Sequence, residues 1–265
     1  MADQPWLTPR SLGITAPEGS DVYEFYMKVK SKPSVLGRVS NLVGSKGIDI
    51  LWMTGQASDD KQTADFFFFA EMCSSTASHS EVVEELRKQD FVLEARSHRL
   101  DRVYFEEFAF PLTSGGHRRV MVLDAVGWAR LVKNFLDRFG SAGQSILHEE
   151  GVAFGQEVAD RLQKRLDAEP GQVVQNLKAL VRASGLGLLE VAEVEKGERF
   201  TVSISDSVLC QGEGEKLADD FLAGVVRGAI GRTYGRDFWV SGTRFEGDDM
   251  VFELAPKGAQ LVPPA

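Results

Sequence analysis

The spacing of apolar residues changes partway along the chain, and this change constrains the fold more than any other feature. Residues 22–99 alternate between short segments of period two and segments of helical period. Residues 124–183 carry mainly helical spacing, and strand-like segments return after residue 187. Because two such patterns share 265 residues, we expect two domains that meet near residues 104–119.

The first pattern predicts a ferredoxin-like unit. In residues 22–30, Phe25, Met27 and Val29 share one face, as in a half-buried strand. Pro33 then stands where a first-turn proline belongs, ahead of a helical run. The expected segments are strands at 22–30, 48–55, 64–72 and 91–97 and helices at 33–46 and 79–89. This order is βαββαβ, a split βαβ unit.

The second pattern predicts an α/β domain with helices packed on an antiparallel sheet, so the chain as a whole is α+β. An apolar helical face begins at Trp128 and ends at Gly140. The expected helices are 124–139, 141–166, a helix opened by Pro170, and 215–234, and the expected strands are 188–194, 199–204, 238–245 and 250–254. Ser78 or Ser80 is a candidate cap of the helix at 79–89.

Glycines interrupt two of the predicted helices. Gly151 and Gly155 lie four residues apart, so another element can approach that backbone closely. Gly224, Gly228 and Gly231 leave the middle of the helix at 215–234 bare. Glycine destabilises a helix relative to alanine, so we expect a packing or ligand-binding reason for these positions.

The full division that we expect has five parts. They are an irregular arm at 1–20, the first domain at 21–103, connector strands at 104–119, the second domain at 120–255 and a loose tail at 256–265.

Charge and apolar runs exclude several classes of function. The chain has 30 basic and 39 acidic residues and lacks the basic patch that nucleic acid requires. Its longest dense apolar stretch, Phe66–Ala70, has the length of a strand, so we expect no membrane span. Cys73 and Cys210 make no disulfide framework and no signal peptide is visible, so we expect a cytoplasmic protein.

One phrase in the first half resembles ACT domains. Lys32-Pro33-Ser34-Val35-Leu36-Gly37-Arg38-Val39, continuing to Gly47-Ile48-Asp49-Ile50, is similar to their strand–Pro–x–Val–Leu–helix–Gly–Ile–x–Ile pattern. The resemblance covers about residues 20–100 and implies a regulatory module that pairs side by side and binds an amino acid or another metabolite. Its candidate contacts are Lys32, Pro33, Ser34, Val35 and Leu36. Many ligand-binding members have glycine where this chain has Ser34.

Several phrases in the second half resemble the 4-vinyl reductase domain. They are Asn134–Gly140, Ile146–Gly151, Phe154-Gly155, and Cys210-Gln211-Gly212 leading into Phe221–Gly224. The family occurs in hydrocarbon-binding proteins, in bacteriochlorophyll synthesis and in aromatic-sensing halves of transcription activators. The resemblance implies a dimer-forming fold with an apolar pocket. Candidate pocket residues are Trp128, Phe135, Phe139, Leu147, His148, Phe154, Cys210, Phe221, Trp239 and Phe245.

We expect neither a metal nor a catalytic constellation. Some members of the resembled family bind zinc through cysteines of the last hairpin, where this chain has Thr243 and Met250. Cys210 cannot supply the four ligands that a structural zinc requires. The neighbouring carboxylates Glu149 and Glu150 point about 100° apart on a helix, so they cannot flank one substrate atom. We therefore expect no catalytic residues and no cofactor.

These features favour a non-catalytic, ligand-responsive regulatory protein. The second domain would hold an apolar small molecule, and the first would dimerise or sense a metabolite. The expected partners are a second copy of the chain and a separate output protein. One alternative is an accessory or catalytic role in reducing a vinyl-bearing tetrapyrrole-like substrate. Another is a dimeric scaffold without ligand.

Overall fold

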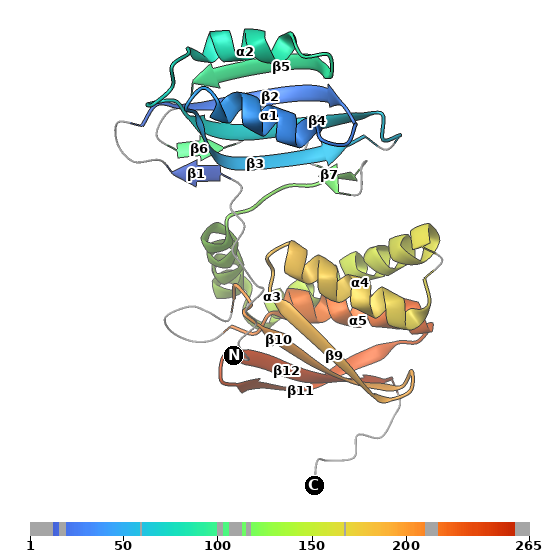
Figure 1. Ribbon diagram of the computed structural model, residues 1–265. Coiled ribbons are helices and arrows are strands. Elements are labelled where there is room, and N and C mark those ends of the chain that lie inside the picture. Colours follow the sequence, from blue (N-terminus) through green and yellow to red (C-terminus); the bar gives the residue numbers. More distant parts are fainter. Residues whose placement is uncertain are drawn as a thin grey trace. The chain divides into compact units, whose positions relative to one another are not determined.

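The structure is a computed structural model of the 265-residue chain. It describes residues 13–15, 20–58, 60–99, 103–105, 113–114, 118–166, 168–209 and 217–257. The fold is mixed α+β with antiparallel sheets, and the chain divides into two compact units, Met1–Met121 and Val122–Ala265 (Figure 1).

The N-terminal unit contains the predicted βαββαβ order of elements. These are β2 (Val22–Lys30), α1 (Val35–Gly44), β3 (Asp49–Ala57), β4 (Thr63–Glu71), α2 (His79–Arg87) and β5 (Val92–Arg99). The strands form one sheet in the order β3-β4-β2-β5, and every neighbouring pair is antiparallel. The central position of β4 explains why Phe68 and Phe69 are both buried although they point to opposite faces.

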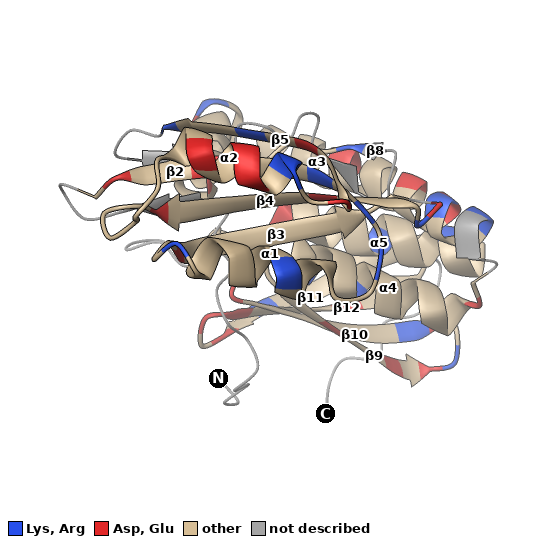
Figure 2. Ribbon diagram, turned by 45° about the horizontal axis from the view of Figure 1, so that its top comes forward, with Lys and Arg blue, Asp and Glu red and all other residues tan. Residues whose placement is uncertain are grey.

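Both helices of this unit are amphipathic and pack on one core. Val39 of α1 and Leu86 of α2 join the same buried cluster as Phe25 and Met27 of β2. The other side of α2 is acidic and is coloured red in Figure 2. Ser78 caps α2 by a reciprocal capping box with Glu81, which confirms the predicted cap.

Two short pairs of strands lie in and beside the segments where we expect the arm and the connector strands. β1 (Gly13–Thr15) pairs antiparallel with β6 (Val103–Phe105), so the expectation of an irregular arm is wrong for these three residues. β7 (Thr113–Ser114) pairs with β8 (Arg118–Arg119). The pairing across 90 residues is a long-range contact that local periodicity does not reveal.

The C-terminal unit packs helices on a second antiparallel sheet. Its elements are α3 (Ala125–Leu166), α4 (Pro170–Ala183), β9 (Leu188–Glu195), β10 (Arg199–Ser205), α5 (Asp220–Tyr234), β11 (Phe238–Glu246) and β12 (Asp249–Pro256). The sheet order is β11-β12-β10-β9 (Figure 1). Residues from α4, α5 and the sheet share one core, for example Leu177, Val226 and Phe252. Helices on an antiparallel sheet are what the sequence predicts.

The break in α3 and the start of α5 are each set by one residue. Gly140 has φ 53° and ψ −134°, so it breaks α3 into two segments at the predicted helix end. The helix expected from residue 215 begins instead at Asp220, because Asp219 accepts a hydrogen bond from the backbone N–H of Leu222 (2.9 Å) and acts as the N-cap. Leu217 therefore lies outside the helix in which it was expected.

Four glycines set the distance between α3 and α5. A methyl group at Gly151 or Gly155 would overlap a backbone carbonyl of α5. A methyl group at Gly224 or Gly228 would overlap a backbone carbonyl of α3. Only residues without a side chain allow two helices to approach this closely. A packing reason, one of the two that we expect for these glycines, is confirmed, because the four positions let α3 and α5 lie in close contact.

Candidate functional site

Three of the predicted pocket residues form an aromatic cluster between the N-terminal part of α5 and α3. The cluster consists of Trp128, Phe154 and Phe221. The ring of Phe221 lies 6.0 Å from that of Trp128 and 6.0 Å from that of Phe154, in edge-on and tilted arrangements. Phe154 is 43% exposed, and the other two rings are half-buried. The cluster therefore presents aromatic surface that the described residues of the chain do not fully cover.

A histidine with a lowered pKa, His148, lies six residues before Phe154 on α3. His148 is on α3 next to Leu147, and both are half-buried. Burial is the main cause that lowers the pKa of His148, and the positive charge of Arg227 adds to it. Glu149 and a hydrogen bond with the backbone of Asp220 oppose this shift. A lowered pKa keeps the imidazole neutral at pH 7, so it can donate and accept a hydrogen bond.

Two carboxyl groups stand at the start of α5 beside Phe221. Asp219 is buried and accepts a hydrogen bond from the hydroxyl of the fully buried Ser207 (2.7 Å). Burial raises the pKa of Asp219 in spite of this bond and that from Leu222. Burial, followed by the charge of Asp219, raises the pKa of Asp220 to about 6. The first turn of α5 is therefore sensitive to protonation near neutral pH.

The remaining predicted residues of the C-terminal unit do not join the aromatic cluster. The rings of Phe135 and Phe139 lie tilted against each other before the break in α3, with 4.9 Å between their centroids. Together with Leu131 they line a shallow pocket of about 470 Å³ on one helix face. Trp239 and Phe245 lie on β11, where Trp239 is 52% exposed and meets the Lys257 ammonium group. Cys210 lies outside the described residues. The structure thus brings Trp128, Phe154 and Phe221 together, and the binding of a ligand by the ten candidate residues stays a prediction.

The predicted contacts of the N-terminal unit lie at the start of α1. Lys32, Pro33, Ser34 and Leu36 are exposed, whereas Val35 is buried. Ser34 is the N-cap, but its φ of 70° is left-handed and its side chain makes no cap hydrogen bond. The first-turn N–H groups of α1 therefore have no side-chain acceptor from Ser34.

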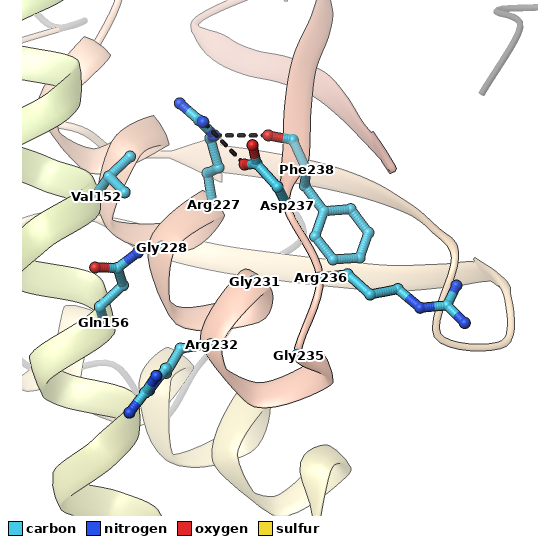
Figure 3. Close-up of a pocket in the computed structure, with 10 residues that line it drawn as sticks. All are labelled: Val152, Gln156, Arg227, Gly228, Gly231, Arg232, Gly235, Arg236, Asp237 and Phe238. Atoms are coloured by element: carbon cyan, nitrogen blue, oxygen red, sulfur yellow. Dashed lines mark hydrogen bonds and ion pairs between the residues drawn. The ribbon is translucent and has the colours of Figure 1, made fainter. Parts of the chain in front are cut away.

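A second pocket of the C-terminal unit, which we call the polar pocket, was not predicted. It has a volume of about 370 Å³ and is shown in Figure 3. Its lining comes from α3, from the C-terminal half of α5 and from the turn into β11: Val152, Gln156, Arg227, Gly228, Gly231, Arg232, Gly235, Arg236, Asp237 and Phe238. None of the candidate residues from the sequence belongs to this set.

Ion pairs hold the three arginines of the polar pocket in place. Arg227 is only 17% exposed and donates to the carbonyl of Phe238 (2.6 Å), to Glu149 and to Asp237 (both 3.1 Å). Arg232 donates through Nε to Asp160 (2.5 Å), and Arg236 donates to Glu198 (3.0 Å). The acceptors of Arg227 and Arg232 lie as far as 78 residues away in sequence, which is why sequence spacing did not reveal the pocket.

Among the described residues, no group of three or more His, Cys, Asp and Glu side chains could hold a metal ion. Since Cys210 is outside this part of the chain, the absence of zinc stays a prediction. Within the same described residues, no helix has both the length and the apolar character needed to cross a membrane.

No protein-family model and no curated protein matches the sequence. Solved structures similar to the chain include the phenol-responsive sensory domain of the transcription activator PoxR with phenol (13% identity, TM-score 0.45, 53% of this chain and 78% of that chain). A vinyl-4-reductase family protein from Methanocaldococcus jannaschii is 18% identical, with a TM-score of 0.38 over 52% of this chain and 84% of that one. The C-terminal domain of the MgtC protein from Mycobacterium tuberculosis is 16% identical, with a TM-score of 0.27 over 32% and 92%.

Proposed function

We propose that the chain is a non-catalytic regulatory protein whose C-terminal unit binds an apolar small molecule at the aromatic cluster. The observation that supports this is the grouping of Trp128 and Phe154 around Phe221 with ring surface left exposed. Ligand sites are mainly apolar and contain few polar groups. An aromatic or hydrocarbon ligand would cover the exposed ring faces and gain the burial energy of that surface.

The polar groups beside the cluster favour a neutral ligand. His148 is the candidate anchor, because its lowered pKa leaves a neutral ring that can hydrogen-bond a hydroxyl group. The carboxylate of Asp219 already accepts hydrogen bonds from the Ser207 hydroxyl and the Leu222 N–H, and it stabilises the start of α5. These groups are suited to positioning a ligand rather than to acid–base chemistry, which supports a role in binding.

The wider architecture is the second part of the proposal. The phrases around Asn134–Gly140 and Phe221–Gly224 support a 4-vinyl-reductase-like assignment for the C-terminal unit. The βαββαβ order and the sheet order β3-β4-β2-β5 support an ACT-like N-terminal unit that pairs or senses a metabolite. We also propose a homodimer that signals to a separate output protein, since α3 exposes apolar side chains such as Val126, Leu131 and Phe139.

Titration calorimetry with two small aromatic probes tests the ligand site. Toluene is fully apolar, and phenol adds a hydroxyl group that His148 could bind. We expect saturable binding of at least one probe by the full chain, and at least tenfold weaker binding by Phe154→Ala, since the substitution removes one ring of the cluster. Phe245→Ala is the matched control, because Phe245 is an exposed aromatic residue of the same unit on β11.

Two results would count against the site. One is that neither probe binds the folded wild-type chain. The other is that Phe245→Ala weakens binding as much as Phe154→Ala, which would indicate adsorption to exposed rings in general. Phe154 is 43% exposed, so we expect its alanine variant to stay folded, and far-ultraviolet circular dichroism checks this.

A further inference from the structure

The two segments of α3 on either side of Gly140 carry opposite charge. Residues 125–139 contain three basic residues and one acidic residue. Residues 141–157 contain three acidic residues and no basic residue. In a chain whose net charge is −9, the first segment is therefore unusually basic, and a strongly acidic segment follows it directly.

The first segment exposes a basic and apolar face, which we call the basic stripe. Its residues share one side of the helix and line the shallow pocket of about 470 Å³: Gly127, Arg130, Leu131, Asn134, Phe135, Arg138 and Phe139. Leu131 is 56% exposed and Phe139 is 52% exposed. Among the described residues, Arg130 and Arg138 form no ion pair. The stripe therefore offers a hollow for an apolar side chain, with two cations beside it.

The second segment exposes an acidic and apolar face, which we call the acidic stripe. Spacings of four, seven, eight and eleven residues place its exposed members on one side of the helix: Ile146, Glu150, Ala153, Phe154 and Glu157. Gly151 and Gly155, which contact α5, lie on the other side. Glu150 forms no ion pair with any described residue. The acidic stripe is thus an anion next to exposed apolar side chains, the complement of the basic stripe.

A second copy of the chain can supply the complement of each stripe. Two basic stripes in contact would bring arginines together without a counter-charge, which disfavours that arrangement. A basic stripe on an acidic stripe instead pairs Arg130 and Arg138 with Glu150, and it covers exposed apolar side chains on both sides. Because every copy carries both stripes, a closed two-fold dimer makes this contact twice.

We propose that the basic stripe of each copy docks on the acidic stripe of a second copy, and that this contact completes the ligand site. Phe154 belongs both to the acidic stripe and to the aromatic cluster, where its ring lies 6.0 Å from that of Phe221. The partner's Leu131 and Phe139 therefore face the open side of the cluster, with the apolar ligand between them. This inference rests on the proposed function, because it specifies the homodimer and the ligand site put forward there.

Sedimentation equilibrium of the full chain without ligand tests the docking by charge reversal. One variant combines Arg130→Glu with Arg138→Glu, and the other is Glu150→Arg. We expect each variant alone to self-associate about tenfold or more weakly than the wild type, since both of its contacts place like charges together. In an equimolar mixture, one contact of the mixed dimer is native and the other has both charges exchanged. We therefore expect the mixture to associate nearly as tightly as the wild type.

Lys133→Glu combined with Arg182→Glu is the matched control. It makes the same change of charge in the same unit, at exposed residues outside both stripes. We expect this variant to associate as the wild type does. The docking is overturned if the wild type is monomeric, if the control weakens association as much as the reversed basic stripe, or if the mixture does not associate better than its components.

Titration of the same proteins with toluene and phenol tests the shared ligand site. We expect each charge-reversed variant alone to bind the probe about tenfold or more weakly than the wild type, and the mixture to recover binding. Probe binding by the dissociated variants as tight as that of the wild type would overturn the shared site. Association is measured without ligand, so the docking can hold or fail independently of the probe binding that tests the proposed function.

Discussion

At the scale of single residues, Ser34 shows how one position sets local stability. Its φ is 70°, a left-handed conformation that L residues adopt at a cost and that glycine adopts freely. We expect Ser34→Gly to raise the free energy of unfolding by about 1 kcal/mol, measured by urea denaturation. Ser34→Ala is the control and should bring no gain, because alanine keeps the Cβ. A glycine variant no more stable than the wild type would contradict this account of the N-cap.

Asp220 gives a residue-scale prediction of pH dependence. Its pKa is raised to about 6 in the folded chain, so the folded state binds this proton more tightly than the unfolded state. The resulting stabilisation is complete below about pH 4 and is lost as the pH rises through about 6. Thermal melts at pH 5 and pH 7.5 should therefore show a larger loss of stability for the wild type than for Asp220→Asn. Equal losses in the two proteins would contradict the burial of this carboxyl group.

The candidate sites show what sequence can predict at this scale. Trp128 could be selected because it lies on a predicted apolar helical face, and Phe154 and Phe221 because they lie in phrases that resemble a family. The polar pocket could not be predicted from the sequence, because Arg227 and Arg232 on α5 form ion pairs with Glu149 and Asp160 on α3. Contacts between residues that are far apart in the sequence depend on tertiary packing, and the local spacing of apolar residues does not predict them.

At the scale of elements, the closely packed pair of α3 and α5 is the central feature of the C-terminal unit. A methyl group at Gly155 would overlap the backbone carbonyl of Val225, and a backbone cannot move aside as a side chain can. We expect Gly155→Ala to lower the free energy of unfolding by about 2 kcal/mol or more. The matched control is Gly171→Ala in α4, where a methyl group meets nothing within 4 Å and should be neutral or stabilising. Similar effects of both substitutions would contradict the close approach.

Sequence and structure agree best where an element is specified locally. The capping box at Ser78 and the break at Gly140 follow from residue chemistry within four positions. The predicted start of α5 is too early, because the helix begins only after Asp219, whose carboxylate accepts a hydrogen bond from the N–H of Leu222. Its partner Ser207 is twelve residues away, outside a capping motif.

At the scale of the whole molecule, the proposed dimer makes a prediction about association. Leu131 is 56% exposed on α3, although its spacing is that of a buried helical face. We expect light scattering to show a dimer, and Leu131→Lys to shift it toward monomer without loss of helix content. Lys133→Ala, a change of a polar residue on the same helix, is the control. A wild-type chain that is monomeric at high micromolar concentration would contradict the proposal.

The measurement that tests the central claim most directly is native mass spectrometry of the purified full chain, followed by organic extraction. If an apolar ligand is bound at the aromatic cluster, we expect a mass above that of the polypeptide, and we expect organic extraction to release a neutral compound. The same compound should return to the wild type on titration and bind Phe154→Ala at least tenfold more weakly. A bare polypeptide mass, together with no binding of toluene or phenol, would contradict the claim that the C-terminal unit binds apolar small molecules.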